Sequence, residues 1–165
     1  DILAQYGVKA TFFMVGENVK RYPELLARVR EEGHAVGNHT YHHLKGFKTC
    51  TRTYLRDAQQ ANAILQTHLF RPPHGRMKYS QKKALHEAGQ TIYLWDVLTH
   101  DYNPCYSVEK MLSVVKRYTR NGSIIVMHDS LKSKDRMLQL LPLMIQWLHA
   151  ALPILISEVL SAILR

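Results

Sequence analysis

The chain has 165 residues, of which 46% are hydrophobic and 21% are charged, a composition typical of one soluble globular domain. Its formal net charge is +9, but the basic residues are dispersed and form no Arg/Lys block with interleaved aromatic side chains. A nucleic-acid-binding surface is therefore not predicted. No apolar run reaches the roughly 18 residues that a transmembrane helix needs, so no membrane span is predicted.

The cysteines and the first residues say little about the compartment. Cys50 and Cys105 lie far apart in the sequence and form no CxxC pair. They cannot make a zinc knuckle by themselves, and one pair does not establish a disulfide framework, so the redox compartment stays open. The sequence opens without a signal-peptide pattern and within what reads as a helix, so we expect the native chain to begin further upstream.

Short apolar, β-rich segments alternate along the chain with amphipathic segments of helical spacing. Strands are expected at residues 9–16, 34–39, 68–73, 91–97 and 123–129, and helices at 18–32, 51–66, 79–88, 107–120 and 135–150. Ser80 and Ser107 are N-cap candidates, and Gly33, Gly89 and Gly122 stand at expected helix ends. The alternation predicts βαβ units and a parallel sheet, either an open doubly wound sheet or a closed barrel.

Polar side chains follow four of the expected strands, at the point where each strand ends. These residues are Asn38, His39, Thr40 and His43; Arg71 and His74; Thr99, His100, Asp101 and Tyr102; and His128 and Asp129. In both candidate architectures functional residues lie just beyond the carboxyl ends of the strands. The clustering therefore predicts an enzyme.

His39 and His43 are four residues apart, so on a helical turn both imidazoles would face one divalent ion, with His42 pointing elsewhere. Zinc is the natural occupant of a site that mixes histidine and carboxylate ligands. The alternative is a surface turn whose histidines lie in water.

The other candidates also have two interpretations each. Arg71 precedes two prolines, and this stiff loop suits a guanidinium held against a carboxylate, or it simply ends a strand. His128 follows a buried strand and is either a general acid or base or a core histidine with its hydrogen bonds satisfied. Asp96 and Asp101 are either carboxylates of the site or solvated loop residues.

The order of these segments resembles the polysaccharide deacetylase family, the NodB-homology or carbohydrate esterase 4 group. The family's ATFFVxG segment, His-Ser/Thr-x-x-His metal motif, RPPYG motif, Asp-Trp motif and Leu-x-His motif are matched by KATFFMVGENV, GNHTYHH, FRPPHG, WDVLTHDY and IVMHD. The resemblance covers roughly residues 1–140. It implies a distorted (β/α) barrel and the removal of N-acetyl or O-acetyl groups from a polysaccharide such as peptidoglycan or chitin-like oligomers.

The resemblance also implies roles for single residues. His39 and His43 would bind a divalent metal, most simply zinc, while the Thr40 hydroxyl stabilises their loop. The metal polarises the amide carbonyl and activates water in such chemistry.

The remaining roles concern the base, the acid and the acetyl pocket. By resemblance, Arg71 orients the catalytic base and the backbone amide of His74 contributes to the oxyanion hole. His128 is the general acid that protonates the departing amine, with Asp101 as a candidate catalytic carboxylate. Tyr102 and Val126 line the pocket that holds the acetyl methyl group.

Several positions depart from the family pattern. The family's TFDDGP motif, whose aspartates supply the base and the third protein ligand, belongs upstream of this sequence. We therefore expect a barrel without its first strand and also without its last, and a weakly active or inactive fragment. Leu98 stands where many members have the aspartate that tunes the acid histidine, with Asp96 or Asp101 as possible substitutes. Tyr102 replaces a tryptophan and His74 a tyrosine.

The expected domain comprises residues 1–150. Residues 151–165 read as another helix where the family has its last strand, and we hypothesise that this tail is not native. The alternative function is a non-catalytic module with the same fold that binds glycan or metal. The family resemblance is the basis for expecting an acetylated polysaccharide partner and an envelope or extracellular location; the sequence does not predict the oligomeric state.

Overall fold

The computed structural model describes residues 1–151 and 160–164. The chain divides into two compact units. The first comprises Asp1–Thr11, Glu32–His34 and Trp95–Arg165, and the second comprises Phe12–Glu31 and Ala35–Leu94. Both units contain parallel strands with helices, which confirms the predicted parallel α/β fold. Within the described ranges, no helix combines the length and the hydropathy of a membrane span.

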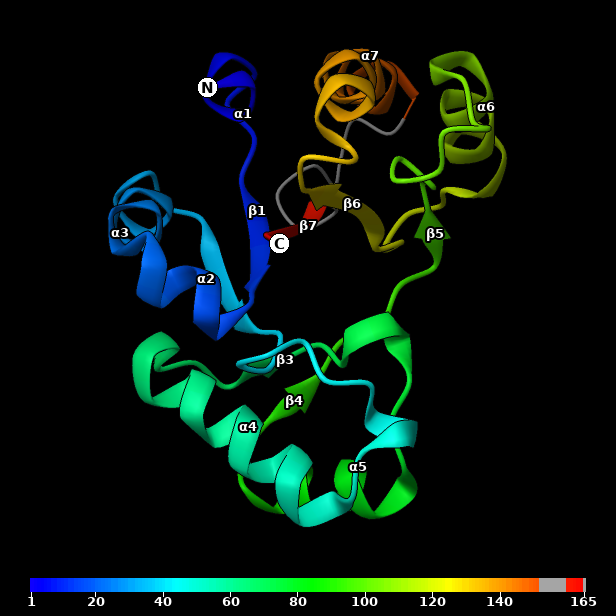
Figure 1. The fold of residues 1–165 in the computed structure, drawn as a ribbon. Coiled ribbons are helices and arrows are strands. Elements are labelled where there is room, and N and C mark those ends of the chain that lie inside the picture. Colours follow the sequence, from blue (N-terminus) through cyan, green and yellow to red (C-terminus); the bar gives the residue numbers. More distant parts are fainter. Residues whose placement is uncertain (152–159, 165) are drawn as a thin grey trace. The chain divides into compact units, whose positions relative to one another are not determined.

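The second unit is built on strands in the order β4-β3-β2-β1, to which β1 contributes its residues from Phe12 onward. The strands are β1 (Ala10–Met14), β2 (Ala35–Asn38), β3 (Leu69–Phe70) and β4 (Thr91–Ile92), of which β2, β3 and β4 pair in parallel. Its helices are α2 (Gly16–Arg21), α3 (Pro23–Glu31), α4 (Thr51–Leu65) and α5 (Tyr79–Glu87), with short 3-10 turns η1 (Gly46–Lys48) and η2 (Pro73–Gly75). Figure 1 shows α4 and α5 beside β3 and β4.

The core of this unit lies between α4, α5 and the short strands. Tyr54 and Ala58 of α4 pack with Phe70 of β3 and Leu85 of α5, and each is at most 4% exposed. Burial of these apolar side chains is the main favourable term that fixes α4 against the sheet. As a result, the side of α4 that carries Ala58 is held close to the end of β2.

The first unit is built on strands in the order β7-β6-β5. The strands are β5 (Val97–Leu98), β6 (Ile125–Asp129) and β7 (Leu160–Leu164), all in parallel pairs. Its helices are α1 (Ile2–Gln5), α6 (Val108–Tyr118) and α7 (Lys134–Ala151). The core consists of fully buried side chains of α6, β6 and α7, namely Met111, Val115, Ile125, Val126, Leu140, Met144 and Ile145.

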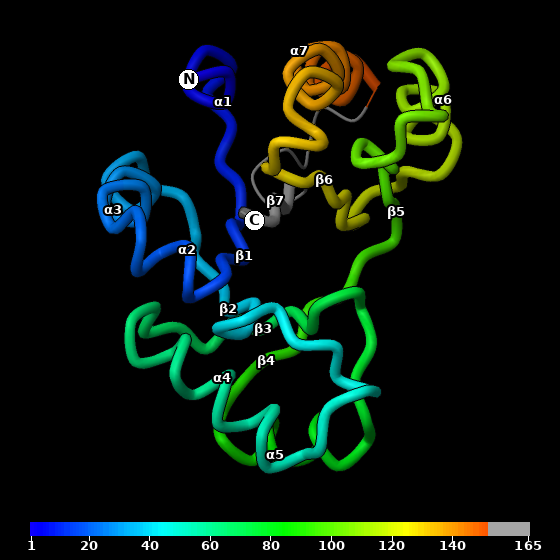
Figure 2. Tube along the Cα trace, viewed as in Figure 1, coloured from blue at the N-terminus to red at the C-terminus, as the bar shows by residue number. Residues whose placement is uncertain are grey.

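The helix predicted over residues 18–32 is two helices, α2 and α3, which Figure 2 shows as separate coils. The break lies at Tyr22, whose φ of −133° and ψ of 65° are not helical. Pro23 explains the break, because the proline ring disfavours the helical conformation of the residue before it. The predicted helix-end glycines do adopt positive φ: Gly33, Gly89 and Gly122.

The two predicted N-caps have different outcomes. The prediction for Ser107 is confirmed, because its hydroxyl accepts a hydrogen bond from the amide of Lys110 at 3.2 Å. The prediction for Ser80 is wrong, because α5 already begins at Tyr79. Its start is stabilised instead by the Gln81 side-chain oxygen, which accepts from the amide of Lys78 at 2.9 Å.

The single strand predicted over residues 91–97 is also wrong, because β4 and β5 are two short strands in different units. The carbonyl oxygens of Tyr93 and Leu94 accept hydrogen bonds from the Arg71 guanidinium, at 3.2 Å and 3.0 Å. These backbone groups are therefore used by a side chain, and the strand cannot continue through them.

The helix predicted for residues 151–165 is corrected in part. α7 extends to Ala151, but Leu160–Leu164 form β7, which pairs in parallel with β6 from Ile125 opposite Leu160 to Asp129 opposite Leu164. β5 pairs with only two residues of β6, so β7 supplies backbone partners along the full length of that strand. Residues 152–159 and 165 lie outside the described residues, and the non-native origin of the tail stays a hypothesis.

His34 joins the start of β1 to the residues that lead into β2. It is 9% exposed, and its Nδ1 accepts a hydrogen bond from the amide of Ala10 at 3.2 Å, so the bond requires a neutral ring. Burial, and then the charge of Lys9, lower the pKa of His34 below its usual 6.5, while Glu32 opposes this shift.

We therefore expect protein stability to be lost as the pH falls below 6.5, because the unfolded chain binds a proton at His34 before the folded chain does. His34→Asn, which keeps a neutral acceptor near the Nδ1 position, should reduce this loss in urea unfolding measured between pH 7.5 and pH 5. The exposed His86 on α5 provides the control variant His86→Asn. Parallel stability curves for wild type and His34→Asn would contradict the assignment.

Candidate active site

The residues that follow β2 form an irregular loop, so the helical turn predicted for His39 and His43 is wrong. Their imidazole rings nevertheless lie together, with centroids 5.0 Å apart. Thr40 and His43 adopt left-handed backbone, with φ of 64° and 56°. Such conformations cost about 1–3 kcal/mol each in residues other than glycine and persist only where the surroundings determine them. The convergence of the two imidazoles therefore depends on what holds the loop.

The loop is held by its own polar groups and by two helices. Asn38 Oδ1 accepts from the Thr40 amide at 2.8 Å, and Asn38 Nδ2 donates to the Ala58 carbonyl of α4 at 2.9 Å. The amide of Gly16, at the start of α2, donates to the Thr40 carbonyl at 3.0 Å. Gly16 permits this approach, because a Cβ there would lie 2.6 Å from the Tyr41 ring. Within the loop, the Thr40 hydroxyl accepts from the amide of residue 44 at 3.3 Å.

His39 has a defined tautomer. The ring is fully buried, and its Nδ1 lies 2.7 Å from the Arg71 carbonyl oxygen. A carbonyl oxygen only accepts hydrogen bonds, so Nδ1 carries the proton and Nε2 of the neutral ring carries the lone pair. Metal-binding histidines typically donate their other ring N–H to such an acceptor, so His39 fits a ligand that binds through Nε2.

The donor set on this loop is smaller than that of a complete catalytic zinc site. In residues 1–151 and 160–164, no three or more His, Cys, Asp or Glu side chains converge as metal ligands. His39 and His43 thus supply two imidazoles, whereas catalytic zinc usually has three protein ligands. The chemistry of the pair fits part of a metal site.

Arg71 lies at the end of β3 and is 1% exposed. Its guanidinium carbon stands 4.1 Å from the centroid of the Phe13 ring, and it donates to the carbonyls of Tyr93 and Leu94. Burial lowers the pKa of Arg71 to about 9, so the guanidinium remains charged at neutral pH. A buried, fixed cation results, and its role in orienting a catalytic base stays a prediction.

Gly37 of β2 lets the Phe13 ring lie directly over the backbone. A Cβ at Gly37 would stand 2.4 Å from two atoms of that ring, so the ring and the Arg71 guanidinium stacked on it would have to move. We expect Gly37→Ala to lower the free energy of unfolding by about 1–3 kcal/mol, measured by urea denaturation. In the double variant that also carries Phe13→Leu, the loss of unfolding free energy should be smaller than the sum of the losses in the two single variants. Full additivity would contradict this contact.

His74 lies in η2, between Pro73 and Gly75. Its backbone is left-handed, with φ of 59°, and its exposed ring lies edge-on to that of His43 with centroids 4.9 Å apart. The hydrogen bond from the Gly75 amide to the Pro72 carbonyl, 3.0 Å, closes this turn. The turn fixes the His74 peptide plane, and the predicted oxyanion role of its amide stays a prediction.

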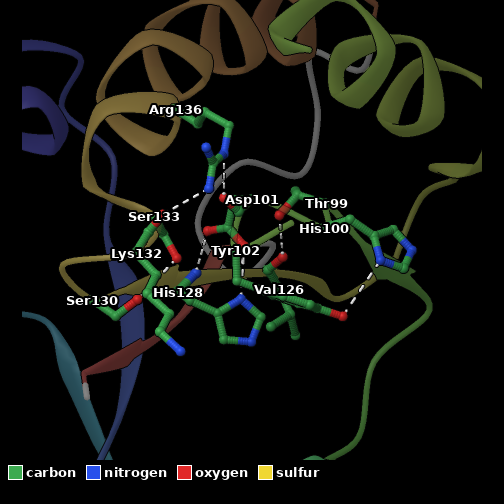
Figure 3. Close-up of polar contacts among 10 residues, drawn as sticks. All are labelled: Thr99, His100, Asp101, Tyr102, Val126, His128, Ser130, Lys132, Ser133 and Arg136. Atoms are coloured by element: carbon green, nitrogen blue, oxygen red, sulfur yellow. Dashed lines mark hydrogen bonds and ion pairs between the residues drawn. The ribbon is translucent and has the colours of Figure 1, made fainter. Parts of the chain in front are cut away.

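In the first unit, β6 ends in a buried ion-pairing arrangement that Figure 3 shows. Asp101 Oδ1 lies 2.7 Å from His128 Nδ1, and Asp101 Oδ2 accepts from the His128 amide at 2.6 Å. Asp101 is fully buried and His128 is 5% exposed. Asp96 is instead exposed and accepts from the Ile124 amide at 2.8 Å. Of the two candidate carboxylates, Asp101 is therefore the one that pairs with His128.

Other predicted residues surround this pair. The Tyr102 ring meets His128 edge-on at a centroid distance of 4.9 Å and is 39% exposed. Val126 lies two residues before His128 on β6, hence on the same face of the strand, and is fully buried. The Thr99 hydroxyl donates to the Val126 carbonyl at 2.9 Å. Figure 3 shows these side chains gathered at the end of β6.

Two residues in these arrangements were not predicted. Arg136, in the first turn of α7, donates through Nε to the Asp101 carbonyl at 2.8 Å and through Nη2 to the Lys132 carbonyl at 2.7 Å. No local sequence signal marks this contact. Asp57 of α4 accepts hydrogen bonds from the loop after β2. The sequence did mark this residue, because it is a charged residue within the buried stripe of α4, between Tyr54 and Ala61.

Comparison with known proteins gives a consistent picture. The polysaccharide deacetylase family model matches residues 1–93. A peptidoglycan-N-acetylglucosamine deacetylase of Bacillus cereus is 35% identical over 137 residues, an alignment that covers 78% of this chain and 63% of that protein. This chain thus spans less than two thirds of the length of that curated relative.

Solved structures show the same fold. The structure of the Bc1960 peptidoglycan N-acetylglucosamine deacetylase has a TM-score of 0.85 and 28% identity, with 98% of this chain and 76% of that chain covered. A mutant of BA3943, described as a carbohydrate esterase 4 family pseudoenzyme with restored enzymatic activity, has a TM-score of 0.76 and 25% identity, with 98% of this chain and 58% of that chain covered. Because the family model matches more than half of its residues, the chain belongs to the polysaccharide deacetylase family.

Proposed function

We propose that this chain serves in the metal-dependent removal of N-acetyl groups from a glycan of the peptidoglycan type. The observation that carries the proposal is the buried pair of Asp101 and His128 at the end of β6, in a chain of the deacetylase family. The B. cereus relative is named a peptidoglycan-N-acetylglucosamine deacetylase, which supports N-acetylglucosamine as the substrate sugar.

His128 has the features of a general acid. Cleavage of an acetamido C–N bond expels nitrogen, which needs a proton to leave as an amine. The Asp101 carboxylate accepts from Nδ1 of His128, so Nε2 is the ring atom that exchanges a proton with substrate. The carboxylate also stabilises the imidazolium electrostatically and holds the ring in one orientation, as in other carboxylate–histidine pairs.

His39 and His43 are the proposed metal ligands, with zinc as the expected ion. A bound zinc ion supplies Lewis-acid chemistry, polarising the acetyl carbonyl and activating water. The protein's own part is to present imidazole lone pairs: the Arg71 carbonyl keeps the proton of His39 on Nδ1, and the left-handed backbone at His43 turns its ring toward that of His39.

The second candidate function is a non-catalytic module that binds glycan or metal. It is favoured by the two-histidine donor set of the described residues. The two functions differ in turnover, because a binding module requires no proton donor at the end of β6.

The test combines acetate release with glycan binding. N-acetylglucosamine oligomers are incubated with the zinc-loaded chain, acetate is measured by a coupled assay, and binding is measured by calorimetry. Catalysis predicts turnover in the wild type, its loss in His128→Gln, and its retention in His68→Gln, which alters an exposed histidine. Binding without turnover would favour the module, and the absence of both would reject the proposed substrate.

A further inference from the structure

Asp57 is a buried carboxylate of α4 whose side chain reaches the loop that carries His39 and His43. It is 5% exposed. Its Oδ2 accepts from the amides of Tyr41 and His42, at 2.7 Å and 3.0 Å, and its Oδ1 lies 2.5 Å from His42 Nδ1. One carboxylate thus binds three N–H groups of two consecutive loop residues.

The opposite edge of the same peptides is held by α2. The amides of Gly16 and Glu17 donate to the carbonyls of Thr40 and Tyr41, each at 3.0 Å. The loop's carbonyls are therefore bonded to the backbone of α2, and its amides are bonded to the Asp57 side chain of α4. The peptide planes between His39 and His43 are fixed, including the left-handed backbone of Thr40 and His43.

We propose that Asp57 is a positioning residue for the His39–His43 pair: it sets the loop so that the two imidazoles converge before a metal binds. It acts through the amides of Tyr41 and His42 and not through contact with the ion. The inference rests on the proposed function only in taking these histidines as the ligands.

The carboxylate is chemically suited to this role. An ionised carboxylate only accepts hydrogen bonds, so both oxygens can face N–H donors. In Asp57→Leu, a branched side chain of similar size replaces the carboxylate and accepts no hydrogen bond, so the amides of Tyr41 and His42 both lose their partner. The variant keeps the size of the side chain, so its effect reports the hydrogen bonds rather than a change in packing.

The test compares metal affinity with stability in matched variants. Zinc and cobalt(II) binding are measured by calorimetry and by the visible spectrum of bound cobalt, on wild type, Asp57→Leu and Thr67→Val. Thr67→Val also removes two hydrogen bonds in the second unit, to the Val36 carbonyl and from the Leu69 amide, but none in the loop. We expect Asp57→Leu to weaken metal binding by about 10–100-fold and to alter the cobalt spectrum, as second-sphere variants do. Thr67→Val should change only the melting temperature.

His39→Ala separates failure of this inference from failure of the proposed metal site. If His39→Ala binds metal as wild type does, the proposed ligands are wrong. If His39→Ala weakens binding but folded Asp57→Leu keeps wild-type affinity and spectrum, the positioning role is overturned.

A second measurement needs no variant and covers the case in which Asp57→Leu does not fold. Hydrogen exchange of the Tyr41 and His42 amides is measured on the metal-free wild type. Positioning by Asp57 requires both amides to be protected before metal is added. Rapid exchange that slows only after zinc addition would mean that the metal, and not Asp57, orders the loop.

Discussion

Asp101→Asn is expected to lower kcat for acetyl removal by about 100- to 10,000-fold, the range in which a positioned general acid contributes. The asparagine oxygen can still accept from the His128 amide, but its NH2 group then faces His128 Nδ1. Nδ1 must become an acceptor, so the proton of the neutral ring moves to Nε2 and the imidazolium loses its carboxylate partner. Steady-state kinetics on N-acetylglucosamine oligomers measure the loss, and 15N NMR of the histidine ring reports the tautomer independently of turnover.

Asp96→Asn is the matched control for this variant. Asp96 lies in the same segment and also accepts a hydrogen bond from a backbone amide, that of Ile124, but its carboxylate does not pair with His128. We expect near-normal kcat and an unchanged His128 tautomer. Equal losses in the two variants would show that general disturbance of the segment, and not the Asp101–His128 pair, accounts for the effect.

His39→Ala is expected to weaken zinc binding by at least about 100-fold, a larger loss than changes outside the ligand sphere usually cause. The substitution removes one of two imidazoles whose ring centroids lie 5.0 Å apart. With it goes the Nε2 lone pair, which is present because the Arg71 carbonyl keeps the ring proton on Nδ1. Calorimetric titration with zinc on wild type and variant measures the effect. Acetate release from the same samples shows whether metal binding and turnover are lost together.

His68→Ala serves as the control, because His68 is exposed and lies before β3, away from the loop that follows β2 in the second unit. Its zinc affinity should match that of the wild type. If His39→Ala and His68→Ala titrate alike, GNHTYHH is a histidine-rich turn without a metal function. Turnover that persists in His39→Ala would instead show that the reaction does not need this ligand.

Much of the architecture could be read from local patterns. The period of apolar residues distinguishes helices from strands, and their alternation predicts a parallel sheet, because parallel strands need crossover connections. Polar residues at strand ends marked His39, Arg71, Asp101 and His128 before any contact was known, since the carboxyl ends of parallel strands meet at one edge. These features depend on residues close together in the chain or on the order of segments.

The choice of partners was decided by tertiary structure. Asp96 and Asp101 are equivalent as sequence candidates, and only the packing of β5 against β6 determines that Asp101 pairs with His128 across 27 residues of chain. Likewise, Arg136 meets the Asp101 carbonyl across 35 residues, and Asp57 meets Tyr41 across 16. Periodicity records which side of an element is buried but not which element covers it.

The same limit explains the structural predictions that failed. Residues 160–164 have a helical pattern of their own, yet they pair with β6, whose backbone offers hydrogen bonds along its whole length. The single strand expected over residues 91–97 divides where the Arg71 guanidinium takes the carbonyls of Tyr93 and Leu94. His39 and His43 converge through left-handed loop backbone and not through a helical turn. By itself, then, the sequence determined the fold class, the family and the candidate residues, because these follow from local periodicity and motif order. Only the tertiary structure decided how those residues are oriented, because orientation depends on hydrogen bonds between distant segments.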